Sequence, residues 1–99
     1  MHTNPIQTAL LEAVAAERRR QDKLVADGRL PFNCSDPNIP DGGKMMVLSE
    51  EYGEVARAAY DNYIDDRRPA PMLRHLQTEL IQLAAVAVAW AESIESDLR

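Results

Sequence analysis

Apolar residues recur at helical spacing in three stretches of the chain. In the first of them, Ile6, Leu10 and Val14 lie three or four residues apart. Side chains at this interval share one face of a helix. The pattern predicts three helices, over about residues 4–26, 43–65 and 71–96.

A stretch rich in proline and glycine separates the first predicted helix from the second. Residues 28–43 hold three prolines and three glycines, which exclude regular secondary structure through them. A loop this long in a small domain is usually functional or disordered. Phe32, the only phenylalanine in the chain, lies in it and suggests that the loop folds back onto the domain. Asp41 is the candidate N-cap of the helix that follows.

Size and composition favour a single all-α domain over residues 1–99. Hydrophobic residues make up 45% of the 99 residues but aromatic residues only 5%, a bias that favours helix over sheet. Three helices in so short a chain cannot cover all their apolar faces. We therefore expect the helical bundle to be completed by formation of a homodimer or homotetramer.

Charge and hydropathy exclude several classes of protein. The net charge of -5 argues against general nucleic-acid binding, which needs a basic surface. The longest apolar run, at 83–91, is too short to span a membrane, and the N-terminus lacks the pattern of a signal peptide. A cytoplasmic protein is expected. The single cysteine, Cys34, cannot form an internal disulfide and is expected to be an ordinary loop thiol.

Three glutamates crowd together in the second predicted helix, at positions 50, 51 and 54. The apolar stripe of this helix, which we expect to face the core, consists of Met45, Leu48, Tyr52, Val55 and Ala59. On a helical wheel Glu51 lies about 40° from the nearest residue of this stripe, and Glu54 about 60° further round. Glu50 points toward solvent.

The third predicted helix places an acid within its apolar face. Leu83, Val86 and Trp90 lie within about 40° of Glu79 on the wheel, and we expect Trp90 to make a core or subunit contact. Burying a lone carboxylate is costly unless it is paired, protonated or bound to a cation. His75 lies on one shoulder of the same face.

Two helices thus each bring acids to an apolar face. Mg²⁺ and Mn²⁺ take oxygen ligands of this kind, and helical bundles build metal sites from inward carboxylates on facing helices. The sequence therefore indicates a site for Mg²⁺, with Mn²⁺ as an alternative. A solvated acidic surface remains open for the glutamates, as does a salt bridge from Glu79 to Arg57 or Arg74.

The acidic motifs resemble those of a known enzyme family. "EEYGE" at 50–54 fits the motif EExxE, and "ELIQ" at 79–82 stands where the motif ExxD would be. Together with "ERRRQDKL" at 17–24, they resemble the MazG-like family of all-α nucleoside triphosphate pyrophosphohydrolases. The resemblance implies Mg²⁺-dependent hydrolysis of a nucleoside or deoxynucleoside triphosphate to the monophosphate and pyrophosphate, in a homodimer or homotetramer.

The resemblance also implies roles for individual residues. Glu51, Glu54 and Glu79 match metal-binding acids, and Gln82 stands at the fourth ligand position, where the family has aspartate. A glutamine carbonyl can ligate a hard cation but brings no charge, which weakens metal binding. Glu50 matches the first motif glutamate, which would hold metal or orient and deprotonate water. Glu50 and Glu51 are therefore the candidate catalytic residues.

Candidate substrate contacts lie outside the acidic motifs. They are Lys44, Arg20 and Lys23 for the phosphates and Phe32 for stacking on the base. The alternatives are a solvated surface position for each cation and a loop anchor for Phe32.

The departure at Gln82 motivates a second hypothesis, a non-catalytic helical oligomer that binds a nucleotide or a protein partner. A third hypothesis keeps the fold with a different substrate, such as a phosphoribosyl-ATP-like nucleotide.

Overall fold

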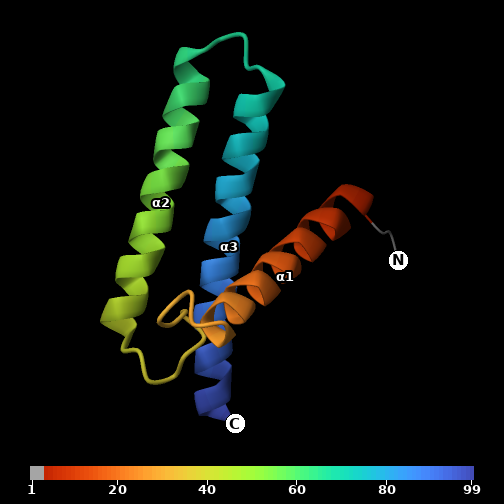
Figure 1. Ribbon diagram of the computed structural model, residues 1–99. Helices are drawn as coiled ribbons and strands as arrows, with labels where there is room; N and C mark the ends of the chain where they lie inside the picture. Colours follow the sequence, from red (N-terminus) through yellow and green to blue (C-terminus); the bar gives the residue numbers. More distant parts are fainter. Residues whose placement is uncertain (1–3) are drawn as a thin grey trace.

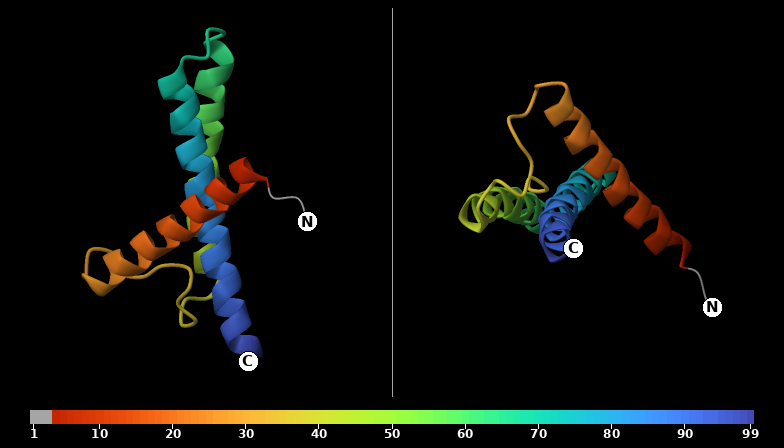
Figure 2. Two further views of the ribbon diagram at one scale, coloured as in Figure 1. Left: turned by 90° about the vertical axis from the view of Figure 1, so that its right-hand side faces the viewer. Right: turned by 90° about the horizontal axis from the view of Figure 1, so that it is seen from below.

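The computed structural model describes residues 4–99, which form three α-helices and, within that range, no strand. They are α1 (Pro5–Ala26), α2 (Asp41–Ile64) and α3 (Ala70–Leu98). The predicted all-α class is confirmed. α2 and α3 lie side by side as an antiparallel hairpin, and α1 crosses α3 obliquely (Figures 1 and 2).

The ends of α1 lie close to the predicted range 4–26, and local signals define them. Asn4 is the N-cap, and its side-chain oxygen accepts hydrogen bonds from the backbone N–H groups of Ile6 and Gln7, each at 3.1 Å. Pro5 occupies the first turn, where its missing N–H costs nothing. Beyond the last turn, Gly28 adopts a φ of 74°, a conformation that glycine takes without strain.

α2 begins earlier than predicted, and its expected cap is wrong. The helix starts at Asp41 rather than near Gly43, and Pro40 takes the N-cap position. The Asp41 side chain does not cap the helix, because one of its oxygens accepts a hydrogen bond from Trp90 Nε1 at 3.0 Å. α3 begins at Ala70, with Pro71 in its first turn.

The face of α2 that packs inward is only partly the one expected, because Leu48 and Val55 are the only residues of the predicted stripe that are half-buried, and Leu48 packs against the core cluster. Met45, Tyr52 and Ala59 are exposed, with Tyr52 at 66%. The buried residues are instead Lys44, Ala58 and Asn62, flanked by the half-buried side chains of Val47, Glu51 and Val55. The inward face is rotated by about 80° from the predicted stripe.

The rotation follows from how few elements cover α2. Within residues 4–99 α2 packs against α3 and not against α1, so only a narrow stripe of it is buried. Two polar side chains enter that stripe because they find hydrogen-bond partners there. Lys44 Nζ donates to Ser93 Oγ at 2.6 Å, and Asn62 Nδ2 donates to the carbonyl oxygens of Ala58 and Met72, both at 3.0 Å. As a result Glu51 lies near the centre of the inward face rather than at its edge.

The loop between α1 and α2 folds back onto the hairpin, as predicted. Its anchor is Cys34, which is buried against Val86 and Ala89 of α3. Trp90 packs against this cluster, which confirms the expected core contact. Phe32 is half-buried. Cys34 is therefore a core residue rather than an ordinary loop thiol, and burial raises its pKa.

Among residues 4–99 no helix combines the length and the apolar character that a membrane span requires.

Candidate metal centre

Three carboxylates converge between α2 and α3. Glu51 and Glu54 come from α2 and Glu79 from α3, and one oxygen of each lies within 4.8 Å of the others. Glu51 and Glu54 are close to one another because residues three apart lie on neighbouring parts of a helix surface. Glu79 reaches them because the inward faces of the antiparallel helices meet at this level. The structure thus brings together the three acids that the sequence predicted as metal ligands.

The three carboxylates repel one another, and burial removes part of the water that would otherwise solvate them. The pKa of Glu51 is raised from 4.5 to about 7, first by burial and then by the charges of Glu54, Glu79, Glu17 and Glu50. The pKa of Glu79 is also raised, first by burial and then by Glu54, against a smaller opposite effect of His75. Both shifts mean that positive charge at this place would be strongly favoured.

Two oxygens of the cluster lack partners. Among residues 4–99, Glu51 Oε2 and Glu79 Oε2 are buried and accept no hydrogen bond. A buried acceptor without a donor costs about 1–3 kcal/mol. The nearest basic group to Glu79 is His75, with Nε2 at 3.8 Å from Glu79 Oε1, and neither Arg57 nor Arg74 forms an ion pair with Glu79 within that range. An all-oxygen set with unsatisfied atoms fits a hard divalent cation.

The other two residues of the acidic motifs flank this cluster. Glu50 is exposed, and its charge contributes to the raised pKa of Glu51. Gln82 is half-buried, one turn after Glu79 on α3, and shares the wall of a cavity with Glu51.

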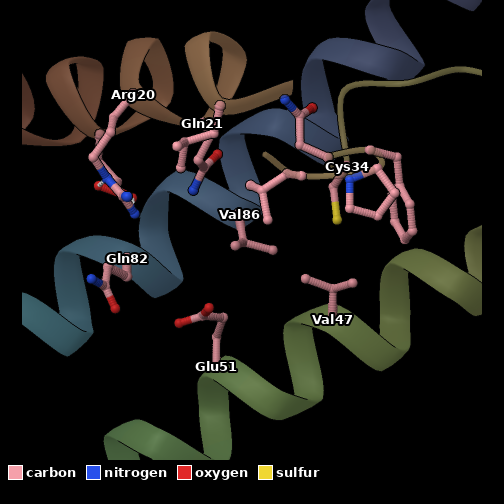
Figure 3. A pocket seen from close by; sticks show the side chains of 13 residues that line it. Arg20, Gln21, Cys34, Val47, Glu51, Gln82 and Val86 are labelled. Carbon is pink, nitrogen blue, oxygen red and sulfur yellow. Dashed lines mark hydrogen bonds and ion pairs between the residues drawn. The ribbon is translucent and has the colours of Figure 1, made fainter. Parts of the chain in front are cut away.

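This cavity, of about 430 Å³, lies between α1, the loop and the hairpin (Figure 3). Glu51 and Gln82 lie at one end, and Figure 3 shows Cys34 at the other. Its apolar lining comes from Leu24, Leu30, Pro31, Phe32, Cys34, Val47 and Val86, and its polar lining from Glu17, Arg20, Gln21, Asn33, Glu51 and Gln82. The cavity therefore joins an acidic end to an apolar end.

Only two of the four predicted substrate contacts lie in the wall of the cavity. Arg20 and Phe32 both line the cavity, whereas Lys23 is exposed and does not. Arg20 donates two hydrogen bonds to Glu17, Nε to Oε1 at 2.6 Å and Nη2 to Oε2 at 2.7 Å. Its pKa is raised first by this pairing and to a smaller extent by Glu51. Its guanidinium thus lies beside the acids.

Lys44 is neither in the cavity wall nor in solvent. It is 3% exposed and donates to Ser93 between α2 and α3. The structure thus places this candidate phosphate contact outside the cavity, and the alternative of a solvated surface lysine is wrong because the inward face of α2 is rotated.

On α1, sequence reasoning missed two polar residues of the cavity wall, Glu17 and Gln21. Glu17 follows Val14 by three residues and Gln21 follows it by seven, so both lie on the apolar face of α1. Their position on the apolar face of α1 could have indicated that they line a cavity. The charged run 17–23 concealed it, because such a run resembles a solvated surface.

Comparisons of this chain with protein-family models, with curated proteins and with solved structures found no match. The acid cluster and the cavity therefore carry the functional argument.

Proposed function

We propose that this chain is a Mg²⁺-dependent nucleotide pyrophosphohydrolase of the MazG-like type, which acts in the cytoplasm. Its substrate is a nucleoside or deoxynucleoside triphosphate, and its products are the monophosphate and pyrophosphate. The observation that carries the proposal is the convergence of Glu51, Glu54 and Glu79, of which Glu51 lines one end of a cavity that is apolar at its other end. A nucleotide has the matching polarity, with phosphates at one end and a flat ring at the other.

The residues that would hold Mg²⁺, or Mn²⁺, are the three clustered glutamates, with the Gln82 carbonyl as a neutral fourth ligand. The unpartnered Oε2 atoms of Glu51 and Glu79 support this assignment. When bound, such a cation neutralises phosphate charge and lowers the pKa of water.

The chain's own side chains supply binding and proton transfer. Glu50 is exposed beside the cluster, so its carboxylate can accept a proton from the attacking water and release it to solvent. Arg20, held by Glu17, offers a guanidinium to the phosphates at the acidic end. Phe32 and its apolar neighbours in the loop exclude water around the base.

We further propose that the chain assembles into a homodimer or homotetramer. Its accessible surface is 7339 Å², whereas a compact monomer of this mass exposes about 5,700 Å². Its radius of gyration is 15.3 Å, against about 13 Å for a compact chain of this length. Met45, Tyr52 and Tyr63 form an exposed apolar stripe on α2, hereafter the α2 outer stripe. Burying this stripe against a second copy would remove part of the excess.

The test is incubation of the protein with a panel of nucleoside and deoxynucleoside triphosphates in Mg²⁺ or Mn²⁺. We expect a nucleoside monophosphate and pyrophosphate, and loss of both in Glu79→Gln. Glu12→Gln, the same change on an exposed part of α1, is the control and should retain activity. A folded, oligomeric sample that releases no monophosphate from any triphosphate contradicts the proposal.

The second candidate is a non-catalytic oligomer that binds a nucleotide or a protein partner. Gln82 favours it, because an amide in place of a carboxylate leaves the cluster with one less charge for a cation. Isothermal titration separates the two candidates. Mg²⁺ binding that Glu79→Gln abolishes supports the metal-dependent enzyme, whereas nucleotide binding that is indifferent to both Mg²⁺ and this substitution supports the binding module.

A further inference from the structure

Gln21 occupies the wall of the cavity between its two ends. It lies on α1, is 9% exposed, and is one of the polar residues that line the cavity. Figure 3 shows its side-chain amide directed into the cavity, above Val86 and Glu51. The residue as a whole is nine-tenths buried, so the part of its amide that reaches the cavity is held in one place by the surrounding protein.

The orientation of this amide is fixed by its neighbour on the same helix. Arg18 Nη1 donates to Gln21 Oε1 at 2.9 Å. Because a guanidinium has only donors, the amide oxygen must face Arg18 and the amide nitrogen must face away from it. Gln21 therefore presents N–H donors to the cavity and no acceptor.

Arg18 cannot easily turn away from this contact. It is 5% exposed, and its Nε and Nη2 donate to the two carboxylate oxygens of Glu92 on α3, at 3.0 and 2.7 Å. Nη2 also donates to Asp22, which in turn accepts a hydrogen bond from Asn33 Nδ2 in the loop at 2.9 Å. One network thus holds α1, α3 and the loop wall, so the donor is preorganised.

The Gln21 amide nitrogen has no acceptor among residues 4–99. The space in front of it belongs to a cavity of about 430 Å³, a volume within the range of small-molecule sites. Leu24, Leu30 and Phe32 line the same cavity and offer apolar surface to a flat ring. This donor is therefore open to a ligand in the cavity that carries an acceptor.

We propose that Gln21 recognises the nucleobase by donating from Nε2 to the carbonyl oxygen at C4 of a pyrimidine ring. The inference rests on the proposed function, since it assumes that the phosphates lie at the acidic end. Uracil and thymine carry a carbonyl group where cytosine carries an amino group. The site then prefers uracil or thymine nucleotides to their cytosine counterpart, because an amino group facing the Gln21 donors leaves both unpaired.

The test uses the α,β-imido analogues of dUTP and dCTP, which cannot be cleaved between the α and β phosphates. Isothermal titration with Mg²⁺ should show the dUTP analogue binding about five- to tenfold more tightly, the effect of one hydrogen bond. Gln21→Glu keeps an oxygen for Arg18 but offers the cavity an acceptor, so the preference should reverse. Gln21→Met, which offers neither donor nor acceptor, should bind the two analogues equally.

Gln7→Glu makes the same chemical change on an exposed part of α1 and should leave the preference unchanged. Circular dichroism establishes that each variant is folded, and if Gln21→Glu is not, the loss of preference in Gln21→Met carries the test. Equal affinity of the wild type for the two analogues, or no binding of either, overturns the inference. So does an unchanged preference in a folded Gln21 variant.

The two proposals fail in different ways. Hydrolysis of dUTP and dCTP with no difference in analogue affinity leaves the proposed enzyme intact and overturns the role of Gln21. A uracil preference that reverses in Gln21→Glu, without hydrolysis of any triphosphate, supports the role of Gln21 and contradicts the enzyme.

Discussion

At the scale of single residues, the cluster of Glu51, Glu54 and Glu79 brings like charges together in a partly buried position. Burial first, and then the neighbouring carboxylates, raise the pKa of Glu51 and of Glu79. The cluster costs stability when it is fully ionised without a counter-ion. Residues with that property usually serve a function rather than the fold.

The raised pKa of Glu51 makes stability depend on pH in metal-free protein. Its pKa is about 7 in the folded state and 4.5 ordinarily, so the unfolded chain loses this proton first as pH rises. The stability that Glu51 contributes is fully present below 4.5 and is lost as pH rises through 7. Urea denaturation in EDTA at pH 5, 6, 7 and 8 should show stability declining over this range.

Glu51→Gln should show a smaller decline over the same range, because its amide does not titrate. Glu12→Gln, exposed and outside the cluster, should behave as the wild type. Identical pH profiles for wild type and Glu51→Gln would contradict the assignment.

Glu79→Gln tests the other helix of the cluster. Without metal this variant should be more stable than the wild type by about 1–3 kcal/mol, because an amide donor replaces a buried charge and can satisfy a neighbouring carboxylate. The wild type should gain melting temperature as Mg²⁺ is added, and the variant should not. Thermal denaturation over a Mg²⁺ series measures both, and an equal Mg²⁺ response in the two proteins would count against the metal site.

At the scale of elements, α1 is the least supported helix. It packs against α3 but not against α2, and it projects away from the hairpin at its N-terminal end (Figure 1). Arg18 holds it through Glu92 and, by way of Asp22 and Asn33, also holds the loop. The cavity depends on this attachment, because α1 and the loop form one side of it.

Arg18→Met should therefore loosen α1 and the loop together. Loss of the hydrogen bonds to Glu92 and Gln21 should lower the free energy of unfolding by about 1–3 kcal/mol. Hydrogen exchange should accelerate in α1 and around Asn33 more than in α2. Arg19→Met, an exposed neighbour on the same helix, is the matched control and should change neither quantity measurably. Uniform acceleration of hydrogen exchange across all three helices would argue against a local role of Arg18.

At the scale of the whole molecule, the accessible surface is larger than that of a compact chain of this mass, and several large apolar side chains are exposed. The α2 outer stripe includes Met45 and Tyr52, two residues that the sequence pattern assigned to a core. Helical periodicity identified a real apolar stripe. Within a single chain the stripe faces outward, and the proposed assembly would make it an interface.

Charges placed on this stripe should dissociate the proposed oligomer. The double variant Tyr52→Glu/Tyr63→Glu should elute as a monomer of 11.1 kDa in size-exclusion chromatography with light scattering. The wild type should have at least twice that mass. Leu98→Glu, which places the same charge on an exposed apolar residue at the end of α3, should remain oligomeric. A monomeric wild type at micromolar concentration would overturn the proposed assembly.

The sequence by itself determined the helices, the loop between the first two, and the meeting of Glu51, Glu54 and Glu79. These features follow from local rules, because side-chain direction repeats with the helical turn and the apolar faces of helices pack against one another. The amino-acid composition alone was sufficient to predict the all-α fold class.

Only the tertiary structure decided which face of α2 is buried, why Asp41 does not cap it, and where Lys44 and Cys34 lie. It also decided that Gln21 turns its donor into the cavity. Each of these depends on a partner distant in sequence, namely Trp90, Ser93, Val86 or Glu92. A pattern along one helix cannot specify such partners, because the free energy of burying a polar or apolar side chain is set by what packs against it.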